Sequence, residues 1–163
     1  MRNTLKAGWW ISVVAVLACV AVTTAQASDR GEKAVGEATA QFYAALNAMF
    51  TGDVGPMKDV WSHAADVTYM GPGGGFLVGW DQVLAIWEAQ AAMKLGGTIK
   101  PEGMRITAGP DIAIASTYEE GENTNADGKP AKVSIRATNL FRKENGKWKM
   151  IGHHTDLLPF LAK

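Results

Sequence analysis

The segment KWKMIGHHTDLL, residues 147–158, is the last long strand pattern of the chain, and it places two histidines beside an acid. Successive side chains of a strand point to opposite faces. One face is therefore expected to carry Trp148, Met150, Gly152, His154 and Asp156, and the other Lys149, Ile151, His153 and Thr155. If the first face lines a cavity, an imidazole and a carboxylate point into it together.

Three further strand patterns precede this segment, and short turn sequences connect all four. They cover Thr98–Ala108, Ile112–Asn123 and Ala131–Lys143. The connection Glu144-Asn145-Gly146 contains Asn-Gly between two alternating runs, which is the strongest short-range signal for a β-hairpin. Four strands with such short connections predict an antiparallel meander.

Helical patterns come before these strands. Apolar residues follow the 3.6-residue period of an amphipathic helix from Val35 to Phe50, with Ser28 or Asp29 as the cap. A short helix follows, and a third runs from Trp80 to Leu95. Two short strand patterns lie between the second and third helices, at Asp66–Met70 and Phe76–Val78. Helices followed by strands predict an α+β domain whose curved sheet, covered by helices, leaves a tapering cavity.

The N-terminal residues have the three parts of a secretory signal. Met1–Lys6 is basic, Ala7–Val22 is apolar, and Ala25-Gln26-Ala27 is a cleavage sequence. This predicts cleavage after Ala27 and a mature domain, residues 28–163, in the periplasm or outside the cell. Two alternatives remain, an uncleaved membrane anchor and a lipoprotein attached through Cys19. Only these alternatives would bring the chain into contact with a membrane.

Length, cysteine content and charge limit the number of domains, the disulfides and the kinds of partner that the chain can have. The chain has 163 residues, enough for one domain after the signal. Cys19 is the only cysteine and lies in the signal, so the mature domain is expected to have no disulfide. With 16 basic and 16 acidic residues and no basic run, the composition argues against a nucleic-acid partner.

Several motifs resemble those of SnoaL-like domains, which belong to the nuclear transport factor 2-like superfamily together with ketosteroid isomerases and scytalone dehydratases. WSHAADVT, residues 61–68, with Met70-Gly71-Pro72 resembles the end of the family's second helix and its first strand. Further similar motifs are Gly79-Trp80-Asp81 with Val83, residues 127–130 (DGKP), 136–138 (RAT) and 145–148 (NGKW), and His154. The resemblance covers residues 28–163. It implies a cone-shaped barrel, in which three N-terminal helices close a curved antiparallel sheet around a pocket, and it implies a homodimer.

The resemblance allows a comparison with ketosteroid isomerases at two functional positions. Those enzymes carry a catalytic aspartate near the end of the strand after the second helix, where this chain offers Met70 or Gly71. Their oxyanion-binding tyrosine lies on the first helix, where this chain has Tyr43. The resemblance therefore argues against ketosteroid isomerase chemistry, and Tyr43 is either a donor in the pocket or part of the core.

His154 and Asp156 are the best catalytic candidates that remain. A carboxylate near an imidazole raises its pKa and fixes its tautomer, which suits a general base. His153 is then expected to point outward, towards a dimer face. His63, at a helix end, is expected to be structural. The three histidines do not have the spacing of metal ligands on one element, so no metal is expected.

Polar and apolar residues complete the predicted pocket. Tyr118, Glu120 and Arg136 would form its rim together with His154, and Phe76, Trp87 and Met104 its apolar wall. Such a pocket would hold a small acid or a carbonyl compound. The alternative is that Glu120 and Arg136 form only a cross-strand ion pair on the surface.

Three functions fit these expectations. The first is an exported binding or accessory domain for a small, partly hydrophobic molecule. The second is a cofactor-independent isomerase, hydratase or cyclase in which His154 is the base, Asp156 orients it, and Tyr43 or Arg136 holds an oxyanion. The third is an interaction subunit that docks a protein on the outer face of its sheet and has a vestigial pocket.

Overall fold

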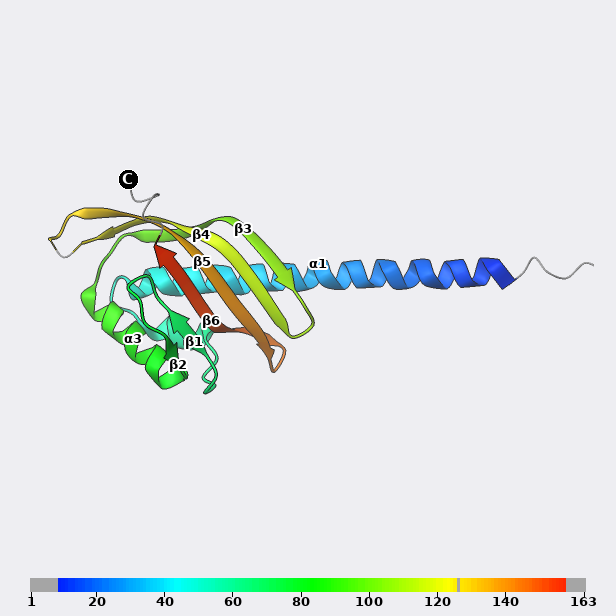
Figure 1. Cartoon of the computed structure of the whole chain (residues 1–163), viewed down its shortest axis with the longest axis horizontal. Helices are drawn as coiled ribbons and strands as arrows, with labels where there is room; N and C mark the ends of the chain where they lie inside the picture. The colour runs from blue at the N-terminus through cyan, green and yellow to red at the C-terminus, as the bar shows by residue number, and fades with distance from the viewer. Residues whose placement is uncertain (1–8, 126, 158–163) are drawn as a thin grey trace, which may run out of the picture.

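The computed structural model describes residues 9–125 and 127–157, with side chains from residue 29 onward. Its helices are α1 (Trp9–Met49), α2 (Gly55–Val60) and α3 (Trp80–Met93), shown in Figure 1. Its strands are β1 (Thr68–Met70), β2 (Leu77–Val78), β3 (Thr98–Ala108), β4 (Ile112–Thr124), β5 (Pro130–Glu144) and β6 (Lys147–Leu157). The predicted α+β class is confirmed.

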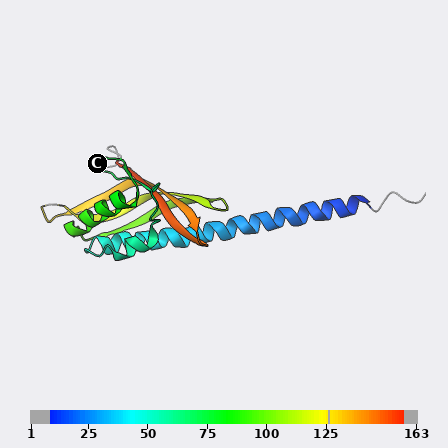
Figure 2. The same cartoon turned by 90° about the horizontal axis from the view of Figure 1, so that it is seen from below.

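The six strands form one curved sheet in the order β2-β1-β6-β5-β4-β3. Strands β3 to β6 form the predicted antiparallel meander, whereas β1 pairs with β6 in parallel. The sheet does not close into a barrel, because β2 and β3 remain its edges. Figure 2 shows α1 and α3 on the same side of the sheet.

Helix α1 is longer than its apolar pattern predicts. It does not begin at Ser28 or Asp29 but is continuous from Trp9. Residues 9–28 contain neither glycine nor proline, so nothing in their composition interrupts helix propagation. Residues 1–8 lie outside the described residues and only the backbone of 9–28 is described, so signal cleavage and export stay predictions. Among the residues whose side chains are described, 29–125 and 127–157, no helical stretch is long and apolar enough to cross a membrane.

The core lies between the helices and the concave face of the sheet. Helix α1 contributes Val35, Phe42 and Met49, each fully buried. Helix α1 packs against β3 at Gly36, where an added Cβ would make an ordinary contact, 3.5 Å from Cδ1 of Ile106. The largest buried side chains from the rest of the chain are Trp61, Trp87 and Phe141.

A β-bulge in β6 changes which of its side chains face the core. Leu140 of β5 pairs with Gly152 and Phe141 pairs with Met150, so Ile151 has no partner in the register. A bulge shifts the alternation of side chains by one residue. Met150 is therefore buried before the bulge, and His153 and Thr155 are buried after it.

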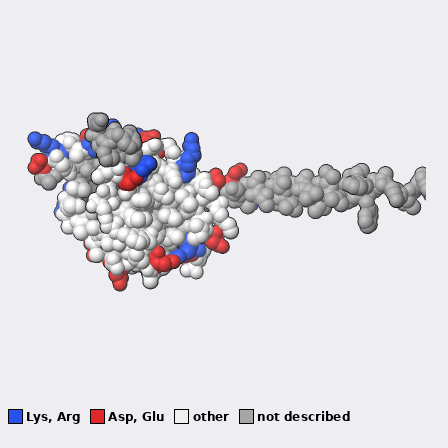
Figure 3. All heavy atoms as spheres, in the orientation of Figure 1, with Lys and Arg blue, Asp and Glu red and all other residues white. Residues whose placement is uncertain are grey.

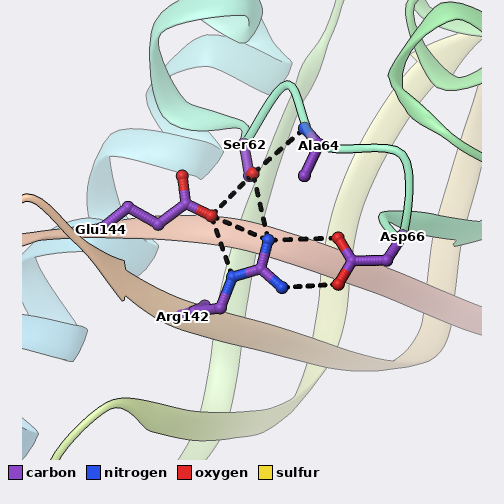
Figure 4. Close-up of polar contacts among 5 residues, drawn as sticks. All are labelled: Ser62, Ala64, Asp66, Arg142 and Glu144. Atoms are coloured by element: carbon purple, nitrogen blue, oxygen red, sulfur yellow. Dashed lines mark hydrogen bonds and ion pairs between the residues drawn. The ribbon is translucent and has the colours of Figure 1, made fainter.

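A polar cluster fastens the connection between α2 and β1 to the sheet, as Figure 4 shows. Arg142 of β5 donates two hydrogen bonds to Asp66, at 2.6 and 3.1 Å, and a third from Nε to Glu144 at 2.9 Å. Ser62 donates to the same Glu144 carboxylate at 2.8 Å. The Arg142 guanidinium also lowers the pKa of Asp66. The cluster therefore holds the residues that lead into β1, whose Tyr69 reaches the functional site.

Candidate functional site

A cavity of about 480 Å³ lies between the helices and the concave face of the sheet. Leu46 of α1, Phe50 in the turn after it, and Trp87 and Gln90 of α3 form the helical side of its wall. The sheet contributes Tyr69, Glu119, His153 and Thr155. The wall is mainly apolar with a few polar groups, as in sites for small molecules.

A chain of buried hydrogen bonds fixes the polar groups of this wall. Tyr43 Oη donates to Glu119 Oε1 at 3.1 Å and accepts a hydrogen bond from Asn139 Nδ2 at 3.3 Å. The other end of this amide, Asn139 Oδ1, lies 2.7 Å from His153 Nδ1. A carbonyl oxygen only accepts, so Nδ1 carries the proton. In the neutral ring, Nε2 then has a free lone pair.

His153 Nε2 faces the carboxyl group of Glu119. The Nε2–Oε1 distance is 3.8 Å, which is too long for a direct hydrogen bond. Burial lowers the pKa of His153 to about 3, and the charge of His154 adds to this effect. Burial also raises the pKa of Glu119 to about 7, although the Tyr43 hydrogen bond opposes the shift. Between these values the site holds a neutral base beside a protonated acid.

Aromatic rings enclose the imidazole of His153. The Phe42 ring lies 5.0 Å from it and the Tyr69 ring, which is stacked on it, 5.8 Å away, measured between centroids. Gln90 Nε2 donates to Tyr69 Oη at 3.0 Å and so fixes that ring. Trp87 contacts Tyr69 edge to face at 4.8 Å. These contacts leave His153 only 4 % exposed and restrict the rotation of its ring.

The predicted catalytic pair does not face this cavity. His154 is exposed and Asp156 is half-buried, and both lie on the outer face of the sheet, opposite His153. The placement of His154 and Asp156 inside the pocket, and of His153 outside it, was therefore wrong. The reason is the bulge at Ile151, which exchanges the two faces of β6 beyond it.

The predicted rim lies outside the cavity as well. Arg136 pairs with Asp156 rather than with Glu120, through a bond from Nε to Oδ1 of 3.1 Å. Glu120 instead accepts a hydrogen bond from Ser134 Oγ at 2.8 Å. Tyr118, Arg136, His154 and Asp156 line a groove on the outer face. Both readings of Glu120 and Arg136 were wrong, because β4 pairs Arg136 with Tyr118 and Ser134 with Glu120.

The predicted apolar wall is divided among three places. Trp87 lies in the wall of the cavity, and Tyr43 lies behind it in the hydrogen-bond chain. Phe76 is 64 % exposed, in the connection between β1 and β2. Met104 packs against the core but does not line the cavity.

Sequence reasoning missed Glu119, Asn139 and Thr155 and misplaced His153. One available signal was the alternation of β4, in which the small residues Ala113 and Ala115 share the face of Glu119 and are buried. Another was Gly152, because a lone glycine inside a strand pattern suggests a bulge. Neither signal says which side of β6 faces the helices.

The outer face of the sheet carries exposed apolar side chains. Ile112, Ile114 and Tyr118 are 47, 41 and 45 % exposed. In the view of Figure 3, both signs of charge lie mixed around the margin of the molecule, and its centre is uncharged. A homodimer, or the docking of another protein on this face, stays a prediction.

Replacing Glu119 by glutamine is expected to change how stability depends on pH. A carboxyl group whose pKa rises from 4.5 to about 7 on folding stabilises the folded protein fully below pH 4.5. This contribution is lost as the pH rises through 7. The free energy of unfolding of Glu119→Gln, minus that of the wild type, should therefore increase by about 3 kcal/mol from pH 4.5 to pH 7.5.

Urea unfolding at several pH values measures this difference. Glu120→Gln is the matched control, because the neighbouring side chain points to the other face, and its difference from the wild type should change far less. A difference for Glu119→Gln that does not vary with pH would show that Glu119 is ionised in the folded protein. Burial of His153 acts with the opposite sign, since its lowered pKa removes stability as the pH falls below 6.5.

Comparisons with known proteins agree with this architecture. No curated protein sequence matches the chain significantly. A candidate dehydratase of the NTF2-like family from Streptomyces avermitilis superimposes with a TM-score of 0.71, at 23 % identity over 81 % of this chain and 99 % of that one. A candidate ketosteroid isomerase from Shewanella frigidimarina has a TM-score of 0.61, at 24 % identity over 76 % and 94 %.

A third similar structure is named as an association domain rather than as an enzyme. It is a candidate calcium/calmodulin-dependent protein kinase type II association domain from Thiobacillus denitrificans, with a TM-score of 0.60 and 26 % identity over 74 % of this chain and 92 % of that one. The sequence profile of the SnoaL-like domain matches residues 35–157, which include every strand and the cavity wall. The chain therefore belongs to the SnoaL-like domain family and has the NTF2-like fold.

Proposed function

We propose that this chain binds a small, largely apolar carbonyl compound in its cavity and moves protons on it with His153 and Glu119, without a cofactor. The observation that carries the proposal is the pairing of two buried groups in complementary proton states. His153 Nε2 has a free lone pair, and the protonated carboxyl of Glu119 lies 3.8 Å from it. Paired titratable groups whose environments separate their pKa values are typical of acid–base sites.

The chemistry follows from the positions of the two groups. His153 Nε2 removes a proton from the carbon next to the carbonyl group, and the bonding electrons move towards the carbonyl oxygen. Glu119 then delivers its proton to a second position of the same molecule. Because the two groups are adjacent, the proton leaves and arrives on the same face of the substrate.

Two net reactions are compatible with this transfer. If Glu119 protonates a hydroxyl group on the next carbon, the C–O bond breaks, a C=C bond forms and water leaves. If it protonates a carbon of an unsaturated ketone, the double bond moves and the product is an isomer. In both cases the proton on His153 returns to Glu119, and no oxidant or reductant is needed. The names of the two similar structures, a candidate dehydratase and a candidate isomerase, belong to these two classes.

The side chains of the cavity wall favour an apolar, flat substrate. Tyr69 and Trp87 line the cavity beside the imidazole, and Leu46 of α1 and Phe50 just after it continue the apolar surface. Aromatic side chains of this kind contact flat rings over large areas. A cavity of about 480 Å³ also lies within the usual range for small-molecule sites.

The test uses 2-tetralone, a bicyclic aromatic ketone with acidic protons next to its carbonyl group. In deuterated buffer at pH 6, the wild-type protein is expected to bind it saturably and to replace these protons by deuterium faster than buffer alone, as followed by proton NMR. Saturable binding without faster exchange would contradict proton transfer and leave a binding domain, the function that the cavity alone favours. The absence of binding and exchange would remove the carbonyl-binding function altogether.

A further inference from the structure

Gly71, directly after β1, has no side chain at a place where the ring of Tyr69 leaves no room for one. A Cβ added at Gly71 would lie 2.7 Å from Cζ and 2.8 Å from Cε1 of Tyr69, and closer still to its Oη. Carbon atoms in favourable contact are about 3.5–4.0 Å apart. The φ of Gly71 is not positive, so its backbone conformation does not require glycine. The position of the Tyr69 ring is therefore what excludes a side chain here.

The Tyr69 ring cannot easily move aside, because neighbouring groups hold it in place. Trp87 contacts it edge to face at 4.8 Å, and Gln90 Nε2 donates to its hydroxyl oxygen at 3.0 Å. Tyr69 as a whole is only 6 % exposed. In a closely packed interior, extra atoms force side chains off their preferred positions. A methyl group at position 71 would thus displace the ring against these contacts.

The same ring lies on the imidazole of the proposed base. The parallel pairing of β1 with β6 makes Tyr69 the direct partner of His153. The two rings are stacked, with centroids 5.8 Å apart and planes 22° apart. The hydrogen bond to Asn139 fixes Nδ1 of the imidazole but not the plane of the ring. Contact with the flat Tyr69 ring fixes this plane, so that Nε2 keeps its direction towards Glu119.

We propose that Gly71 is a positioning residue of the acid–base site, because its missing side chain lets the Tyr69 ring lie flat on His153 and hold the imidazole in its working orientation. Gly71 does not line the cavity, so it acts only through Tyr69. The expected effect on rate rests on the proposed function. The arrangement of the three residues can be tested without any reaction.

Gly71→Ala is expected to slow the deuterium exchange of saturating 2-tetralone at least about tenfold, because a small misplacement of a catalytic group can cost two orders of magnitude. Gly73→Ala is the matched control. It makes the same substitution two residues further along, again without a positive φ, and a Cβ there would meet nothing within 4 Å. Its exchange rate should stay within about twofold of the wild-type rate.

Proton NMR of the His153 ring tests the arrangement directly. The ring current of an aromatic side chain shifts protons stacked on its face upfield. In Gly71→Ala the His153 ring signals should therefore move downfield, towards those of the exposed His154, and in Gly73→Ala they should not move. The spectrum of His153→Asn identifies these signals by their absence. A substitution that only lowered stability would leave the signals of the folded molecules in place.

Removing the ring shows whether Gly71 acts through it. In a Tyr69→Ala background, Gly71→Ala should change the exchange rate by less than about twofold, because the clashing atoms are gone. In a Tyr69→Phe background it should again lower the rate, because Cζ and Cε1 remain. If Gly71→Ala alone does not fold, circular dichroism should show that Tyr69→Ala with Gly71→Ala folds as well as Tyr69→Ala.

Unchanged exchange and unchanged His153 signals in Gly71→Ala would overturn the inference. An equal loss of rate, or of folding, with and without the Tyr69 ring would overturn it too. The NMR signals separate this inference from the proposed function. Signals that respond to Gly71→Ala in a protein that catalyses no exchange support the positioning and refute only the proton transfer. Exchange in the wild type with signals that ignore Gly71→Ala refutes only the positioning.

Discussion

His153→Asn is expected to slow the deuterium exchange of 2-tetralone by at least about 100-fold relative to the wild type, because general-base catalysis typically contributes two to four orders of magnitude. The asparagine amide can still donate to Asn139 Oδ1, which is the bond that Nδ1 makes in the wild type. What it cannot supply is the basic lone pair of Nε2. The affinity for 2-tetralone should change much less than the rate.

His154→Asn is the matched control for this experiment. The residue is adjacent on the same strand and receives the same substitution, but its side chain is exposed on the outer face. The exchange rate of this variant should remain within about twofold of the wild-type rate. The opposite result, in which His154→Asn abolishes exchange and His153→Asn does not, would place the chemistry in the outer groove. Comparing the deuterium-exchange rates of the two variants by proton NMR therefore decides which face of β6 carries the chemistry.

Gly97→Ala is expected to lower the free energy of unfolding by about 3–5 kcal/mol. Gly97 lies between α3 and β3 with a φ of 76°, and a Cβ there would come within 1.8 Å of the Glu122 carbonyl oxygen. That oxygen belongs to the backbone of β4, so a side-chain rotation cannot relieve the clash. The loss is a large part of the 5–15 kcal/mol that usually stabilises a domain. Urea unfolding followed by circular dichroism measures it.

Gly96→Ala separates the clash from the backbone conformation. Gly96 has a φ of 61°, but a Cβ there would meet only Thr124 Oγ1, at 3.7 Å. This variant should lose only the 1–2 kcal/mol, approximately, that a left-handed backbone costs a non-glycine residue. Equal losses in both variants would show that β4 moves away without cost. The close approach matters for the site because Leu95 and Asn123, on either side of this contact, line the cavity.

Most of the secondary structure follows from local patterns. The Asn145-Gly146 pair predicts a tight hairpin, and both residues have positive φ, 50° and 79°, as a two-residue turn of this kind requires. The apolar period from Val35 to Phe50 predicts the buried face of α1. The short connections between the four long strand patterns predict the meander. These features depend on residues close in sequence, which is why the order of helices and strands could be predicted.

The sequence by itself therefore determined the α+β class, the family and the presence of a histidine-bearing strand beside a cavity. Only the tertiary structure decided which histidine faces that cavity. The bulge at Ile151 is a relation between β6 and β5, because it exists only where Phe141 pairs with Met150 and Leu140 with Gly152. In the same way, the pKa of Glu119 is raised only because side chains from other segments of the chain, among them Tyr43 and His153, bury it. Strict alternation along one strand contains none of this information, since a single unpaired residue reverses every side chain beyond it.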